Sequence, residues 1–189
     1  MKSIADGQFS HAEGYNTHTY NSASHAEGYE SVADGIAAHA EGMSCIANTN
    51  YAHAEGFETS AIAQDAHAEG HGSYACGTNS HAEGWYTQAL SSESHAEGDH
   101  SIASKPSAHA EGDHSKANGI AAHAEGVYSL ADSKGAHAGG LSSVAWNEGS
   151  FAHGCCVSAV ANYAVAFGKN TYAGKFGDKT KEAAFAANN

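Results

Sequence analysis

The tetrapeptide His-Ala-Glu-Gly recurs nine times at intervals of fourteen residues. A fixed period of this length indicates one structural unit stacked repeatedly along an axis. The same register extends back to Ser3 and continues through three modified copies, which begin at His137, Phe151 and Val165. We therefore predict a single repeat domain over residues 1–177, with about thirteen coils. Residues 178–189 lose the repeat and are rich in helix formers, so we expect a C-terminal cap or neck segment there.

With its histidine at position 2, the repeat reads Ser/Ala-His-Ala-Glu-Gly-x-x-Ser/Thr-x-Ala-x-x-x-x. Small residues at positions 1, 3, 8 and 10 alternate with His, Glu and a variable residue at positions 2, 4 and 9. An alternation of period two is typical of β-strands, and the recurring glycine disfavours helix. We predict an all-β solenoid with two short strands per turn. Its small residues face inward, and its hydroxyls bond to adjacent turns.

Composition and charge exclude several function classes. The net charge is −13, with eight lysines and no arginine, so we expect no nucleic-acid partner. No apolar run approaches the ~20 residues of a membrane span, and the N-terminus enters the repeat directly. We expect no membrane insertion, signal peptide or anchor in this chain. The four cysteines occupy different repeat positions, which predicts free thiols rather than a zinc site or a disulfide ladder.

A coil filled with alanine and serine buries too little apolar surface to offset the entropy of the ordered chain. The solenoid therefore needs a partner. The repeated His/Glu face is far more uniform than the face at position 9, so it is the expected contact surface.

The repeat resembles the YadA-like heads of trimeric autotransporter adhesins and related appendages of phage tails and necks. Where those repeats read Ser-Val-Ala-Ile-Gly, this chain reads Ser-His-Ala-Glu-Gly, and its last copies return to apolar residues at Phe151, Val165 and Phe167. The resemblance implies a left-handed parallel β-roll of fourteen-residue repeats, packed as a homotrimer. It places positions 2 and 4 toward the trimer axis. It also implies a location at the cell surface, outside the cell or on a virion.

The predicted trimer interface contains the residues at positions 2 and 4 of the repeats. They are His11, Glu13, His25, Glu27, His39, Glu41, His53, Glu55, His67, Glu69, His81, Glu83, His95, Glu97, His109, Glu111, His123, Glu125, His137, Phe151, Val165 and Phe167.

Three hypotheses compete for the histidines and glutamates. The first is structural: in each layer three His and three Glu form a ring of hydrogen bonds between chains, which fixes register. The second is metal binding, since imidazole and carboxylate suit zinc and related ions. Against it, the motif recurs without local variation that marks a dedicated site; only His153, near Cys155 and Cys156, stands apart. The third, catalysis, needs one perturbed constellation. We favour the first, and expect no enzyme activity, catalytic residue, cofactor or metal.

Outward aromatic residues are candidates for contact with a host-surface or matrix protein or a glycan. No aromatic position recurs strictly enough to predict a ladder. The candidates are Tyr15, Tyr29, Phe57, Tyr74, Trp85, Tyr86, Tyr128 and Trp146. An ice-binding array of Ser/Thr at position 8 is disfavoured, because that column is predicted to be internal.

The predicted function is a non-enzymatic structural and adhesive module, such as a trimeric adhesin head or a segment of a phage tail fibre. The alternative is a self-assembling filament subunit without a dedicated receptor, formed by end-to-end stacking.

Overall fold

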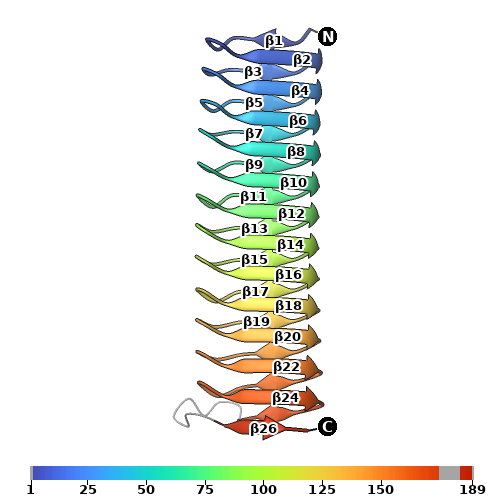
Figure 1. The fold of residues 1–189 in the computed structure, drawn as a ribbon, viewed down its shortest axis with the longest axis vertical. Coiled ribbons are helices and arrows are strands. Elements are labelled where there is room, and N and C mark those ends of the chain that lie inside the picture. The colour runs from blue at the N-terminus through green and yellow to red at the C-terminus, as the bar shows by residue number, and fades with distance from the viewer. Residues whose placement is uncertain (1, 175–183, 189) are drawn as a thin grey trace. The chain divides into compact units, whose positions relative to one another are not determined.

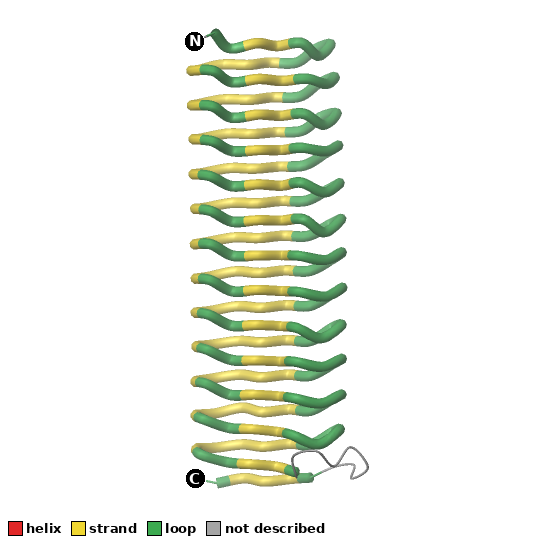
Figure 2. Tube along the Cα trace, turned by 180° about the vertical axis from the view of Figure 1, so that it is seen from behind, coloured by secondary structure: helices red, strands yellow, loops and turns green. Residues whose placement is uncertain are grey.

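A computed structural model describes residues 2–174 and 184–188, and within these residues all regular structure is β-strand (Figure 2). The chain divides into two compact units, Met1–Ser94 and His95–Asn189. Each unit is a parallel β-solenoid of fourteen-residue repeats, as the sequence predicts. Apart from the three-residue strand Phe185–Ala187 at the C-terminal end, each described coil contains one strand of five residues and one of two residues, joined by short turns (Figure 1).

In the first unit, the odd-numbered strands form one parallel sheet and the even-numbered strands form another. The strands are β1 (Ile4–Ala5), β2 (His11–Tyr15), β3 (His18–Thr19), β4 (His25–Tyr29), β5 (Val32–Ala33), β6 (His39–Met43), β7 (Ile46–Ala47), β8 (His53–Phe57), β9 (Ser60–Ala61), β10 (His67–His71), β11 (Tyr74–Ala75), β12 (His81–Trp85) and β13 (Gln88–Ala89).

The second unit repeats this arrangement, with the long strands in one sheet and the two-residue strands in the other. Its strands are β14 (His95–Asp99), β15 (Ile102–Ala103), β16 (His109–Asp113), β17 (Lys116–Ala117), β18 (His123–Val127), β19 (Leu130–Ala131), β20 (His137–Leu141), β21 (Val144–Ala145), β22 (Phe151–Cys155), β23 (Ser158–Ala159), β24 (Val165–Lys169), β25 (Tyr172–Ala173) and β26 (Phe185–Ala187).

The interior of both units consists of very small side chains. Among the residues that the structure describes, all but three of the buried apolar residues are alanine, and the exceptions are Cys45, Val157 and Val160. The Ser/Thr column at position 8 is also buried, which confirms that it cannot serve as an exposed ice-binding array. Its serine hydroxyls donate to the glycine carbonyl of the next coil, as when Ser115 Oγ lies 3.1 Å from the Gly126 oxygen. These serines are satisfied between turns, whereas the buried hydroxyl of Thr59 has no hydrogen-bond partner.

Glycine at position 5 is required by the close approach of consecutive coils. Gly112 has a φ of 101°, a region that side chains rarely adopt, and a Cβ there would lie 2.1 Å from the carbonyl oxygen of Gly126. The turns that follow, at positions 7 and 14, have a left-handed backbone in almost every coil, with non-glycine residues such as His114 and Ala121. The coil geometry therefore includes repeated local strain that the stacking must offset.

The C-terminal segment rejoins the sheet within its described part. Val165 pairs in parallel with Phe185, and Phe167 with Ala187, so β26 lies beside β24 in the register that the repeats use. The helix formers of this segment do not produce a helix at 184–188, because pairing with β24 overrides local propensity there. Residues 178–183 and 189 of the predicted cap lie outside the described residues.

Candidate functional site: the histidine and glutamate columns

The long strands carry His at position 2 and Glu at position 4 on the outer face of the sheet, while the alanine between them is buried. Side chains two residues apart on a strand share a face, so the alternation of the motif produces this separation directly. Because the strands pair in exact parallel register, each histidine lies beside the histidine fourteen residues away.

The histidine rings of the first unit form a continuous stack. From His39 through His53 and His67 to His81, ring centroids are 4.6–4.7 Å apart, and the planes are inclined by 20° or less. The first rings of the column are less parallel: His11 and His25 meet edge to face, 5.1 Å apart.

The second unit has the same stack, and it ends in phenylalanines. His95, His109 and His123 are 4.7–4.8 Å apart with planes within 6°. His137 follows with a tilted ring and contacts Phe151 at 4.7 Å. Phe151 in turn lies 5.1 Å from Phe167, so the apolar residues of the last copies occupy the same face as the His/Glu columns.

In most coils the imidazole faces the carboxylate of its own repeat. The Nε2 atoms of His39, His53 and His67 lie 3.3, 3.6 and 3.5 Å from the nearer glutamate oxygen. All three distances are longer than the donor–acceptor distance of a good hydrogen bond, about 2.7–3.2 Å. Several Nε2 atoms, including those of His53 and His67, are buried and lack a hydrogen-bond partner in the single chain. Stacking therefore holds the imidazole rings in place, but the hydrogen-bonding capacity of their nitrogens is not fully used in the single chain.

The two columns remain accessible in the single chain. From His25 to His81 the histidine side chains are 34–38% exposed, and the paired glutamates are 46–52% exposed. Burial, together with the charges of His53 and His81, lowers the pKa of His67 despite the neighbouring glutamates. A lone chain therefore favours the neutral form of this imidazole.

One coil in the second unit breaks the pattern, and Gly139 is the reason. Gly139 stands where a glutamate is expected, and the space that it leaves is occupied by the Glu125 carboxylate and the ring of His153. Glu125 Oε1 lies 3.4 Å from His137 Nε2 and 3.5 Å from His153 Nε2. Burial acts to raise the pKa of Glu125, but the hydrogen bond and charge of His137 outweigh it and lower that pKa.

This displacement changes the preceding coil. Since Glu125 turns toward the following coils, His123 faces the glutamate of the coil before, with Nε2 3.9 Å from Glu111 Oε1. Glu111 also keeps its own partner, and its Oε2 lies 3.8 Å from His109 Nε2. One carboxylate is thus shared by two stacked imidazoles.

The predicted interface residues therefore lie together on one face within each unit, with Glu111 and Glu125 departing from the regular pairing. His153, singled out in the sequence for its closeness to two cysteines, instead contacts Glu125 from two coils away. The Sγ atoms of Cys155 and Cys156 are 3.8 Å apart and unbonded, and all four cysteines are free thiols, as predicted.

The sequence interpretation missed a column of rings at position 6 of the first unit, which Met43 divides into two short stacks rather than one continuous ladder. Tyr15 and Tyr29 stack at 4.8 Å, and His71 stacks on Phe57 at 4.6 Å and on Trp85 at 3.9 Å. Counting each repeat position within one half of the chain would have revealed this column. Because these rings cover one another's faces, they expose mainly their edges.

In the second unit, the corresponding turn carries Asp-His pairs that the sequence analysis also overlooked. Asp99 and Asp113 each contact the neighbouring histidine through Nδ1, and the rings of His100 and His114 stack at 4.8 Å. The signal in the sequence is the Asp-His-Ser triplet, which occurs twice at the repeat spacing.

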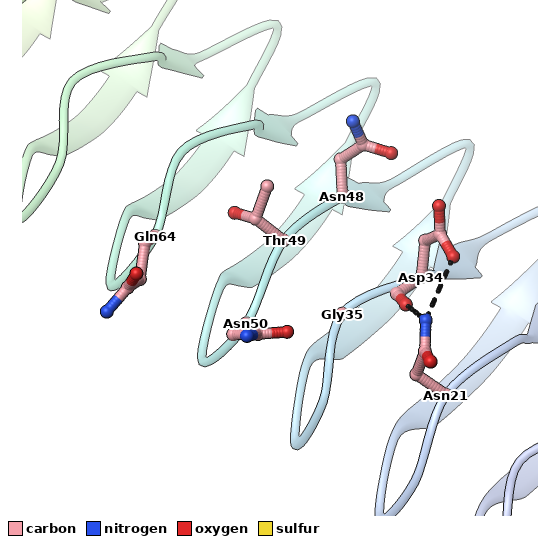
Figure 3. A pocket seen from close by; sticks show the side chains of 7 residues that line it. All are labelled: Asn21, Asp34, Gly35, Asn48, Thr49, Asn50 and Gln64. Atoms are coloured by element: carbon pink, nitrogen blue, oxygen red, sulfur yellow. Dashed lines mark hydrogen bonds between the residues drawn. The ribbon is translucent and has the colours of Figure 1, made fainter.

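The pocket drawn in Figure 3 lies on the turns of the first unit and is lined by polar side chains such as Asn50, Gln64 and Thr49. The Asn21 amide contacts Asp34 of the next coil, and Asn50 Oδ1 accepts a hydrogen bond of 3.0 Å from the Ile36 backbone. These amides link consecutive turns. The polar side chains that line the pocket therefore have a structural role in the stacking of the coils.

No protein-family model and no curated protein matches the chain. Among the described residues, no helix is present that is long and apolar enough to cross a membrane.

Proposed function

We propose that the protein is a non-enzymatic structural and adhesive module that assembles as a homotrimer through its His/Glu columns. The observation that carries this proposal is the pair of half-exposed columns, present in both units, on solenoids whose interior is almost entirely alanine and serine. The coil encloses only small side chains, so burial of its interior contributes little to its stability. A further contact surface, apolar or polar, is needed to stabilise it.

The chemistry of the columns suits contact with further copies of the same face. In a regular coil the carboxylate uses one oxygen toward its own imidazole, and about half of the glutamate side chain remains exposed. Three chains would place three imidazoles and three carboxylates in each layer. Nδ1 of one chain could donate to the free oxygen of the next, closing a ring whose charges balance when the histidines are protonated. The main effect of these rings would be to fix the register of the three chains relative to one another.

Three parts of this proposal rest on the resemblance to YadA-like heads: the assembly of three chains, the left-handed coil, and the placement of positions 2 and 4 toward the trimer axis. On the same basis we propose a role as an adhesin head or phage tail-fibre segment, at a cell surface or on a virion. Outward side chains such as Tyr128 and Trp146, both exposed, are then available for a host-surface protein, matrix protein or glycan.

Histidine footprinting tests which face is buried. Diethyl pyrocarbonate modifies accessible imidazoles, and mass spectrometry locates the modified residues. We expect the column histidines, such as His53 and His67, to be protected at neutral pH, while His114, a half-exposed histidine at a turn, reacts. Equal modification of His53 and His114 would contradict burial of the columns.

Charge reversal gives a second, independent test. The double variant Glu55→Lys, Glu69→Lys introduces cations into the column, whereas Glu30→Lys, Glu58→Lys makes the same change at turn residues of position 7. We expect only the first variant to lower the solution mass. Retention of the assembly by both variants would remove this face from the interface, and a mass far above that of a trimer would favour the filament alternative.

A further inference from the structure

The shared carboxylate of Glu111 creates a cluster that the regular coils lack. Among residues 2–174 and 184–188, the only group of three or more His, Cys, Asp or Glu whose ligand atoms all lie within 4.8 Å of one another is His109, Glu111 and His123. The three side chains come from the neighbouring strands β16 and β18 of the second unit.

The imidazole nitrogens of this cluster are unsatisfied, whereas the Glu111 carboxylate also has a hydrogen bond with Glu125. The Nε2 atoms of His109 and His123 are buried without a hydrogen-bond partner, and the Glu111 oxygens lie 3.8 and 3.9 Å from them. Those distances are too long for hydrogen bonds. Zinc binds imidazole nitrogen and carboxylate oxygen at about 2.0–2.2 Å, so two ligands of one tetrahedral ion are about 3.3 Å apart. All three ligand atoms lie within 4.8 Å of one another, so closing the cluster around an ion requires them to move inward and the two imidazoles to turn out of their parallel stack.

We propose that His109, Glu111 and His123 bind one divalent transition-metal ion of the zinc class, through two imidazole nitrogens and one carboxylate oxygen. The fourth coordination position is left for water or for a group from another chain. This inference goes beyond the proposed function and does not depend on the trimer, since one chain supplies all three ligands.

Gly139 is the local variation that distinguishes this coil. With glycine there, Glu125 turns away from His123, and His123 becomes available to Glu111. In the first unit, Glu55 and Glu69 stay with His53 and His67 of their own repeats. A regular coil therefore provides one imidazole per carboxylate, whereas this coil provides two.

The experiment is a titration of the full chain with Zn²⁺ by isothermal calorimetry, and with Co²⁺ by visible absorption, after removal of bound metal with a chelator. Cys76→Ser, Cys155→Ser and Cys156→Ser remove the three thiols that are not buried, which would otherwise compete for either ion. We expect one tight equivalent per chain and a cobalt spectrum without thiolate charge transfer. Measuring solution mass in the same samples separates this result from the outcome for the trimer.

Matched variants locate the site. Glu111→Gln and His123→Gln should each weaken binding at least tenfold, within the range known for ligand and support residues. Glu69→Gln, the equivalent change in a regular coil, and His114→Gln, at a stacked Asp-His pair, should leave the affinity unchanged.

Gly139→Glu keeps all three ligands but restores the regular pattern. Its Cβ would meet only side-chain atoms, 2.6 Å from His153 Cδ2 and 2.7 Å from Glu125 Oε1, so Glu125 is expected to move back toward its own coil. We expect affinity to fall at least tenfold while the circular dichroism spectrum is retained. Absence of a tight equivalent, or equal losses in Glu69→Gln and Glu111→Gln, would overturn the assignment.

Discussion

Replacing Gly112 with alanine should destabilise the second unit far more than the same replacement at Gly135. Both glycines have a positive φ, 101° and 61°. A Cβ at Gly112 would lie 2.1 Å from the Gly126 oxygen and 2.9 Å from its carbonyl carbon, whereas a Cβ at Gly135 would meet nothing within 4 Å. The two substitutions therefore separate a steric clash between coils from a backbone preference.

The magnitudes follow from these contacts. At Gly135 only the left-handed conformation is penalised, at about 1 kcal/mol, and alanine already occupies the equivalent position at Ala121 with a φ of 52°. At Gly112 the backbone atoms cannot yield as a side chain would, so β16 and β18 must separate locally. Loss of two or three strand hydrogen bonds at about 1 kcal/mol each, added to the strain, gives about 3–5 kcal/mol.

Urea unfolding of Gly112→Ala and Gly135→Ala, followed by far-ultraviolet circular dichroism, measures the difference. We expect the free energy of unfolding to fall by about 3–5 kcal/mol for Gly112→Ala and by about 1 kcal/mol for Gly135→Ala. Losses that agree within about 0.5 kcal/mol would refute the role of close coil contact, because backbone preference alone would then explain both.

Three further predictions follow from the interior and the columns. Ser115→Ala removes the hydrogen bond that the buried hydroxyl donates to the half-buried Gly126 oxygen at 3.1 Å, so it should cost about 1 kcal/mol in urea unfolding; no change would mean that the hydroxyl is dispensable. Ala110→Leu inserts three carbons into a fully buried site and should cost at least about 3 kcal/mol, whereas the exposed Ile120→Leu should be neutral; equal effects would contradict a closely packed interior. In a single chain that has dissociated from the trimer, burial lowers the pKa of His67, so the unfolded chain takes up its proton first. The stability of that chain is complete above about pH 6.5 and falls below it, and NMR titration of His67 above pH 6.5 in the dissociated chain would contradict this.

The sequence was sufficient to predict the coil and the direction of its side chains. Period-two alternation around Ala26 and its equivalents separated buried from outward positions, and the Ser/Thr column at position 8 proved to be internal. The prediction succeeds because small residues and a strict fourteen-residue period restrict the backbone to few arrangements.

The details of the outer face could not be predicted in the same way. Nothing in the motif indicates that Gly139 lets Glu125 reach His153 two coils away, since that contact depends on the space left by an absent side chain. The strand at Phe185–Ala187 was likewise missed, because its partner, β24, is set by tertiary pairing rather than by helix propensity.

The most direct test of the central claim is the solution mass of the unaltered chain, measured by light scattering at pH 7 and again at pH 4.5. If three chains bury their His/Glu columns against one another, the mass at pH 7 is three times 19.3 kDa. It should fall at pH 4.5, because acid neutralises carboxylates in general and so removes the negative charge that balances the imidazoles. A mass of 19.3 kDa at pH 7 would contradict the account, because the columns would then remain open to solvent.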